Sequence, residues 1–126
     1  EDLDLNNIAG MSLKLFLEYS QLDYAELWMI SLDKKSMILE AFEGPDHIIP
    51  NREIREFNGK VGLMSEIIKR DDLVYVEDLQ KHPNVERSQF LIKNNFNSAV
   101  FASSVRSIVC GNWIGNSHSL NAKTTS

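Results

Sequence analysis

Cys110 is the residue whose type alone suggests covalent or redox chemistry, because the chain of 126 residues contains one cysteine. A thiol reductase resolves its oxidised cysteine with a second thiol, which this sequence does not supply. One cysteine also excludes an intrachain disulfide and a zinc centre built from several thiolates. Gly111 follows in a segment that we interpret as a turn, and we expect Cys110 to be an unreactive thiol.

The three histidines do not form a metal-ligand pattern. His47, His82 and His118 lie in three separate segments of the chain. Metal-binding histidines that share an element recur at a fixed short spacing, such as positions i and i+4 of a helix, and no pair here does so. The sequence therefore predicts no metal site, and it assigns no cofactor.

Gly59 and Gly62 precede an amphipathic segment and suggest either a phosphate-binding loop or a tight turn. A P-loop has four residues between its glycines and continues as Gly-Lys-Ser/Thr, which this sequence does not. We interpret the pair as a turn into the next helix, with helix amides that meet an anionic ligand group as the alternative. The sequence has neither a Gly-x-Ser-x-Gly elbow nor a spaced carboxylate pair, so we predict no catalytic residues.

The composition is typical of one globular domain over residues 1–126, with 43% hydrophobic and 25% charged residues. The net charge of -5, without a cluster of Lys and Arg, argues against nucleic-acid binding. No apolar run approaches the roughly 18 residues of a membrane span, so we expect no membrane contact and a cytoplasmic location. The chain begins without Met and ends in polar residues, and we interpret it as a piece of a longer, multidomain protein.

Hydrophobic periodicity predicts the first elements. Residues 24–32 are expected to form a central strand that is covered on both faces, because 27–30 are all apolar. A polar turn at 33–36 leads to a partner strand at 37–43, which makes an antiparallel hairpin. Residues 3–20 have the spacing of a helix, with an expected buried face of Leu5, Ile8, Ser12, Leu15, Phe16 and Tyr19.

Shorter elements separated by turn residues follow. Cys110 to Trp113 are interpreted as a turn that leads into a last strand at 113–120. Hairpins with intervening helices predict an α+β fold rather than a doubly wound parallel sheet. The remaining predicted elements are strand 52–57, helix 62–70, strand 73–76, helix 84–94 and strand 98–105.

In this order the motifs resemble the GAF domain, and the match covers nearly the whole chain. The hairpin of 27–32 and 37–42 is followed by the glycine pair and by a strand that ends at Asp78, with Pro83 after it. Ser98 then begins a strand, and Ile114-Gly115 lies near the end. The sequence departs from the family after this point, because 116–119 are polar and the family's closing helix is missing.

The resemblance implies a central antiparallel sheet of five to six strands with helices on both faces, a PAS-like (profilin-like) arrangement. The first helix would cover one face, and segments 44–70 and 79–97 would enclose a ligand pocket on the other. Asp78 has the alternative role of capping a turn. The residues expected to bind a ligand are Trp28, Phe42, Val61, Met64, Tyr75, Asp78, Phe90, Phe96, Ser98 and Phe101.

The resemblance also implies a function. In a signalling protein of this family, an unidentified small molecule would bind the domain and shift the state of an output domain in the same chain. The terminal helices would form a homodimer. The parent would be a two-component histidine kinase, a cyclic-dinucleotide enzyme or a transcriptional regulator, and we expect this domain not to be an enzyme.

Two alternatives stay open. One is a dimerisation and relay module without a ligand, which the amphipathic first helix suggests. The other is a redox enzyme that uses Cys110, since some relatives of the GAF domain reduce free methionine sulfoxide with several cysteines.

Overall fold

The computed structural model describes residues 5–51, 54–56, 63–70, 73–81, 88–104 and 106–114. The elements in chain order are α1 (Leu5–Ser20), β1 (Tyr24–Ile30), β2 (Ser36–Glu43), β3 (Ile54–Glu56), α2 (Leu63–Arg70), β4 (Leu73–Val76), the 3-10 helix η1 (Leu79–Lys81), α3 (Ser88–Lys93), β5 (Phe96–Ser103) and β6 (Ser107–Ile114). Among these described residues, no helix has both the length and the apolar character needed to cross a bilayer.

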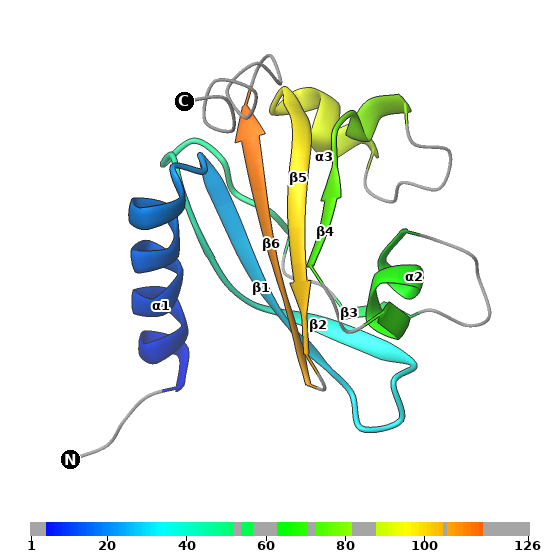
Figure 1. Cartoon of the computed structure of the whole chain (residues 1–126). Helices are drawn as coiled ribbons and strands as arrows, with labels where there is room; N and C mark the ends of the chain where they lie inside the picture. Colours follow the sequence, from blue (N-terminus) through cyan, green and yellow to red (C-terminus); the bar gives the residue numbers. More distant parts are fainter. Residues whose placement is uncertain are drawn as a thin grey trace.

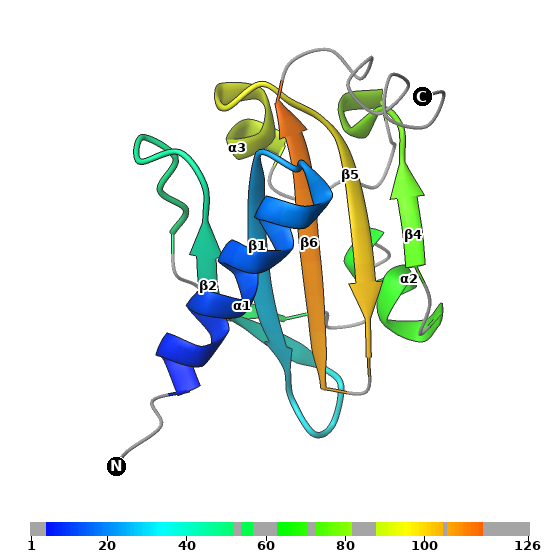
Figure 2. The same ribbon diagram turned by 60° about the vertical axis from the view of Figure 1, so that its left-hand side comes forward.

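One antiparallel sheet organises the described residues. Its six strands lie in the order β3-β2-β1-β6-β5-β4, and every neighbouring pair is antiparallel. Helix α1 lies on one face of this sheet, while α2 and α3 lie on the other (Figure 1). Figure 2 shows α1 crossing the face formed by β1 and β2. The predicted α+β fold, an antiparallel sheet between helices, is confirmed.

The β1–β2 hairpin closes through a polar turn around Asp33. The Ser31 hydroxyl donates to Asp33 Oδ1 at 2.7 Å, and the Lys35 backbone N–H donates to the same oxygen at 3.0 Å. These two hydrogen bonds, in that order of importance, lower the pKa of Asp33 below its usual range. Lys34, between Asp33 and Lys35, takes the left-handed conformation with a φ of 61°. The turn therefore fixes the register of the hairpin that begins the sheet.

The two faces of the sheet are packed differently. Under α1 lies a small cluster in which Leu13 packs with Ala25 and Ala41. The opposite face carries the main core, which includes the fully buried Trp28 and Phe96. Small residues on one face let α1 approach closely, and large residues on the other face hold the shorter helices further away.

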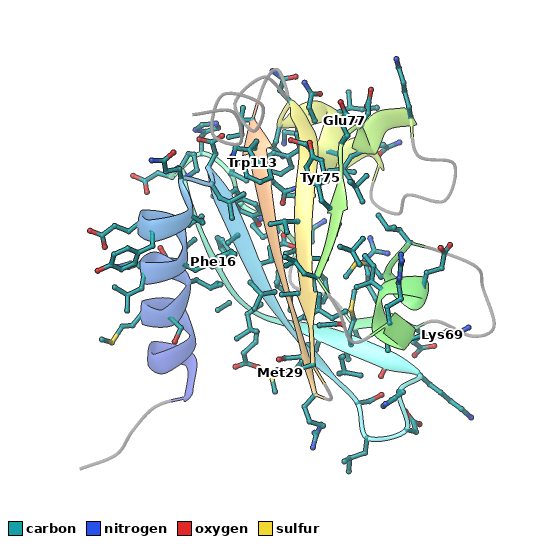
Figure 3. All side chains as sticks on the ribbon, viewed as in Figure 1. Phe16, Met29, Lys69, Tyr75, Glu77 and Trp113 are labelled. Atoms are coloured by element: carbon teal, nitrogen blue, oxygen red, sulfur yellow. The ribbon has the colours of Figure 1, made fainter. Side chains whose placement is uncertain are left out.

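Helix α1 turns a different face toward the sheet from the one predicted. Leu13 is buried and Phe16 points toward the sheet (Figure 3), but Leu15 and Tyr19 are 53% and 83% exposed. The prediction used apolar spacing alone, but several apolar residues of this helix do not pack against the sheet. The face defined by Leu13 and Leu17 lies about one residue, or 100°, away from it.

The segment interpreted as a turn at 110–113 lies inside a strand, so that prediction is wrong. The chain turns earlier, where the Ser104 N–H donates to the Ser107 carbonyl at 2.8 Å, and β6 then continues to Ile114. Gly111 is required by close packing, because a Cβ at this position would contact Leu22 and Phe16. The sequence does not distinguish this role of glycine from its role in turns.

The remaining predicted elements agree with the structure within a few residues. Strand 52–57 is found as β3, helix 62–70 as α2 and strand 73–76 as β4. Of the predicted helix 84–94, the described part forms α3, and strand 98–105 begins two residues earlier as β5. The glycine pair at 59 and 62, Pro83 and residues 115–126 lie outside the described residues.

Replacing Gly111 by alanine is expected to destabilise the fold by about 1–3 kcal/mol, the usual cost of overpacking. The new methyl group would press on Leu22, which is 7% exposed, and would lie 3.2 Å from Phe16 Cε2. Gly10→Ala in α1 is the matched control, because its Cβ would meet Glu43 Oε2 at 3.6 Å and alanine favours a helix. Urea unfolding measures both; a Gly111→Ala domain as stable as wild type would contradict the packing role.

Candidate functional site

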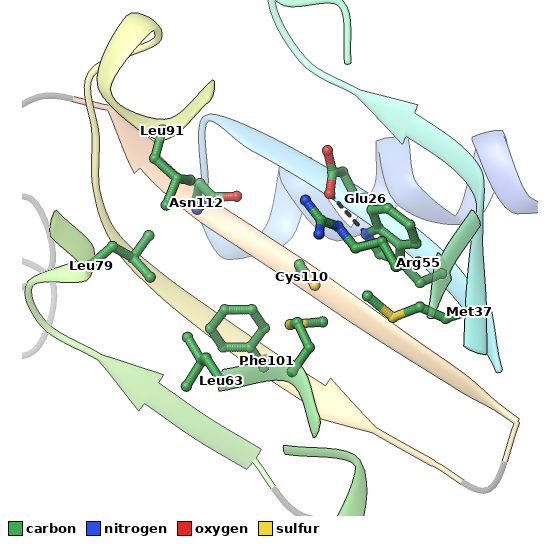
Figure 4. A pocket seen from close by; sticks show the side chains of 11 residues that line it. Glu26, Met37, Arg55, Leu63, Leu79, Leu91, Phe101, Cys110 and Asn112 are labelled. Carbon is green, nitrogen blue, oxygen red and sulfur yellow. Dashed lines mark hydrogen bonds between the residues drawn. The ribbon is translucent and has the colours of Figure 1, made fainter. Parts of the chain in front are cut away.

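A cavity of about 50 Å³ lies between the sheet and the short helices that cover its main-core face (Figure 4). Neighbouring strands form its floor, and α2, η1 and α3 contribute its roof. Most of its lining is apolar with a few polar groups, the usual composition of a small-molecule site. The lining residues are Glu26, Trp28, Met37, Arg55, Leu63, Met64, Leu79, Leu91, Phe101, Cys110 and Asn112.

The strand register brings the polar lining residues together. Glu26 pairs with Cys110 across β1 and β6, and Cys110 pairs with Phe101 across β6 and β5. Tyr24 pairs with Asn112, so Asn112 lies diagonally next to Glu26 on the same face of the sheet. Cβ atoms of such direct and diagonal neighbours are about 5–8 Å apart. Side chains from two distant parts of the sequence therefore face one cavity.

Glu26 is a carboxylate in the middle of the central strand, and it is only 3% exposed. The Tyr24 hydroxyl donates to its Oε2 at 2.6 Å, and Trp28 Nε1 donates to its Oε1 at 2.8 Å. Residues two apart on a strand share a face, so these donors come from the same strand as the acceptor. In the close-up, the guanidinium of Arg55 from β3 lies beside this carboxylate (Figure 4). The carboxylate is therefore held in one orientation toward the cavity.

Asn112 is the second buried polar group of the cavity, at 7% exposure. Its backbone carbonyl accepts a hydrogen bond from the Asp23 N–H at 2.9 Å. Within the described part of the chain, no protein group forms a hydrogen bond with its side-chain amide. Its side chain lines the cavity, so a molecule there would contact the amide.

Comparisons with protein-family models and with curated proteins give no match to this sequence. Solved structures do match. The GAF domain of a phosphoenolpyruvate-protein phosphotransferase (ptsP) from Coxiella burnetii has a TM-score of 0.72 at 15% identity, over 93% of this chain and 71% of that chain. The nlh2 GAF domain of A. aeolicus, in an inactive state, has a TM-score of 0.69 at 8% identity, over 98% and 77%. This chain has the GAF-domain fold.

The matching solved structures include enzymes. The free methionine-R-sulfoxide reductase from Neisseria meningitidis, in complex with its substrate, has a TM-score of 0.67 at 12% identity, over 93% of this chain and 67% of that chain. In this GAF-fold domain Cys110 lies in the cavity wall and is 5% exposed. The fold alone therefore does not distinguish a binding domain from an enzyme. That distinction has to be argued from the residues of the cavity.

Three of the residues expected to bind a ligand line this cavity: Trp28, Met64 and Phe101. Phe90 and Phe96 instead form an aromatic cluster with Tyr24, whose ring centroid lies 5.1 Å from that of Phe96 and 6.2 Å from that of Phe90. This cluster belongs to the main core, so its rings support the cavity residues without lining the cavity.

Of the other expected residues, none that the structure describes lines this cavity. Phe42 is partly buried against the main core, and Val61 lies outside the described residues. Tyr75 packs edge-on against Trp113, with centroids 6.3 Å apart (Figure 3), and burial followed by the Glu77 charge raises its pKa. Ser98 is fully buried and by strand alternation faces away from the side of Phe101. Tyr75 and the exposed Asp78 line a second, more open pocket of about 380 Å³ beside α2.

The polar residues of the cavity were not expected from the sequence. Glu26 stands in an otherwise apolar strand, between Tyr24 and Trp28 at alternate positions, and this spacing is the signal that identifies a carboxylate with two donors on its own face. Asn112 carries no such local signal, because its neighbour Gly111 suggests a turn. Among the described residues, no group of three or more His, Cys, Asp and Glu side chains is placed to hold a metal ion.

Replacing Glu26 by alanine is expected to destabilise the fold by about 2–4 kcal/mol, because the buried Trp28 N–H and Tyr24 hydroxyl lose their acceptor. Glu26→Gln is the matched control, since its amide accepts from Trp28 and donates to the Tyr24 oxygen, and we expect a loss of about 1 kcal/mol. Urea unfolding followed by tryptophan fluorescence measures both. Equal losses in the two variants would show that the hydrogen bonds to Glu26 do not stabilise the fold.

Proposed function

We propose that this GAF-fold domain is a sensory or regulatory part of a signal-transduction protein and that it binds a small molecule in the cavity. The observation that supports this proposal is that Glu26 and Asn112, each more than nine-tenths buried, face the same cavity. Burying such groups costs folding free energy, and packing alone favours apolar residues at both positions. Tyr24 and Trp28 offset part of that cost at Glu26, and a ligand that forms hydrogen bonds in the cavity would offset more of the total.

Binding would act on the rest of the protein through a shift of populations. The floor of the cavity belongs to the sheet, and its roof includes Leu63 of α2, Leu79 of η1 and Leu91 of α3. A ligand that contacts both favours the arrangement in which the roof packs on the floor. The output domain would lie in the same chain, in a cytoplasmic histidine kinase, cyclic-dinucleotide enzyme or transcriptional regulator.

We propose binding rather than turnover because of the chemistry of Cys110. A thiol that reduces a sulfoxide is oxidised to a sulfenic acid, and a second thiol must return it to the thiol state. The chain contains one cysteine, so this second thiol would have to come from another molecule. At 5% exposure, the Cys110 sulfur is poorly accessible to such a molecule.

Enlarging Leu79 to phenylalanine is expected to fill the cavity and weaken binding, because this side chain is 2% exposed and forms part of the roof. Denaturing extraction of the purified wild-type domain, followed by mass spectrometry, should release one small molecule in near-stoichiometric amount. Extraction of Leu79→Phe should release at least tenfold less, and the volume-conserving control Leu79→Met should retain it. Equal release from wild type and Leu79→Phe would contradict binding in this cavity.

A second candidate function is a dimerisation and relay module without a ligand, and exposed residues of α1 favour it. Met11, Leu15 and Tyr19 are 65%, 53% and 83% exposed. They follow one another at i, i+4 and i+8, so they form a single stripe on the helix face that does not contact the sheet. Such a stripe fits a homodimer through the terminal helices.

The dimer is expected to depend on the stripe at its centre. Leu15→Glu should convert a dimer to a monomer, because it places a charge in an apolar contact while keeping a good helix former. Ile92→Glu on α3 is the matched control, since Ile92 is 62% exposed and lies on the other side of the sheet. Sedimentation equilibrium measures both, and a wild-type domain that is already monomeric would rule out the relay role for these residues.

A further inference from the structure

We propose that the edge of the sheet at β4, together with α2, is a docking groove for an extended segment of a partner protein that carries two consecutive basic residues. The segment would add to the sheet as a further antiparallel strand beside β4. This proposal does not depend on ligand binding in the cavity described above.

β4 is the last strand of the sheet in the described part of the chain. It pairs with β5 on one side and ends the strand order on the other. Figure 2 shows β4 at the margin of the sheet, with α2 beside it. An edge strand directs part of its backbone N–H and C=O groups away from the sheet, and another extended chain can pair with such groups.

A pocket of about 380 Å³ follows this edge. It is lined by Val74, Tyr75 and Val76, three successive residues of β4. Successive residues of a strand point to opposite faces, so a pocket that touches all three extends along the edge rather than over one face only. The opposite wall is one face of α2, with the helical spacing of Leu63, Glu66, Ile67 and Arg70.

Apolar side chains of β4 are exposed on the side of the sheet away from α2. Leu73 is 68% exposed and Tyr75 is 41% exposed. Soluble proteins usually protect edge strands with charged residues, because exposed apolar ones favour pairing with another chain. On the α2 side, Val76 and Ile67 are buried and form an apolar base. A strand added at this edge would therefore cover apolar surface on both faces.

The charges of the groove indicate which segment fits. The acidic lining residues are Glu66, Glu77 and Asp78, and the basic one is Arg70. Asp78 also forms an ion pair with Lys81 at 3.8 Å, but both side chains are exposed, and exposed pairs are weak. The groove therefore carries an excess of negative charge, which complements a basic segment.

The strand direction predicts where the basic residues of the segment lie. Every neighbouring pair of strands in the described sheet is antiparallel, and antiparallel pairing is slightly the more stable kind. The N-terminal end of an antiparallel segment would lie beside the C-terminal end of β4. Glu77 and Asp78 follow directly there (Figure 3). The groove thus matches a segment that begins with two basic residues and continues with β-branched ones.

Three peptides test this groove. The first is acetyl-Arg-Arg-Val-Thr-Val-Thr-amide, and the second has glutamate in place of both arginines. The third is the arginine peptide with N-methyl groups on its third to fifth residues, which removes the backbone donors that strand pairing needs. ¹H–¹⁵N NMR of the domain follows the backbone amides of β4 and α2. The amides of α1, on the opposite face of the sheet, are the internal control.

The arginine peptide is expected to shift the amides of β4 and α2 saturably and to leave those of α1 unchanged. The glutamate and N-methylated peptides should each bind at least fivefold more weakly. Equal binding of the glutamate peptide would overturn the basic partner, and equal binding of the N-methylated peptide would overturn strand addition. Shifts of the same amides on dilution of the free domain would assign the edge to a second copy instead. No saturable shift with any peptide would overturn the docking groove.

A charge-neutralising double variant supplies the second test. Glu77→Gln/Asp78→Asn keeps the side-chain shapes and should weaken binding of the arginine peptide at least fivefold. Glu18→Gln/Asp46→Asn is the matched control, because it removes the same charge outside the groove and should bind like wild type. All four side chains are exposed, so both variants are expected to fold. Equal affinities of the two variants would overturn the role of Glu77 and Asp78.

Discussion

The burial of one carboxylate in the central strand is the constraint on which the candidate site depends. Removing Glu26 from water is costly, and its own strand offsets that cost through the donors of Tyr24 and Trp28 on either side of it. These donors hold both carboxylate oxygens in fixed positions. The alternation of β1 thus places a polar group on the core face of the sheet and keeps it oriented there.

The contrast between the two faces of the sheet explains where a cavity can exist. On the α1 face, Ala25, Ala41 and Gly111 are small, so the helix and the chain after it pack directly on the strands. On the other face, large side chains such as Trp28 and Phe101 keep the short helices at a distance. Side chains of different length meet there, and a small space stays between them next to Glu26 and Asn112.

Local patterns predicted most of the fold but only part of the site. The hairpin of β1 and β2 follows from apolar runs around a polar turn, and α2 follows from helical spacing. The errors arise where one residue type has two physical uses: glycine serves turns and close packing, and an apolar helix residue faces either the sheet or the solvent. Asn112 could not be predicted because it becomes a cavity residue only through the register of β6 with β1, a long-range pairing without a local signal.

The short helices of the roof make the cavity suited to a change of state. Helix α2 has eight residues, α3 has six and η1 has three, lengths at which a helix in water is not stable by itself. Their order therefore depends on packing against the floor, where Leu63, Leu79 and Leu91 meet the cavity. A ligand that supplies contacts in this space adds to that packing free energy, whereas the sheet beneath, held by its ladder of hydrogen bonds, changes little. Under the proposed binding function, the difference between the empty and the occupied state would thus be concentrated in the roof, and a segment that reads this state would contact the roof or the strands that carry Glu26 and Asn112.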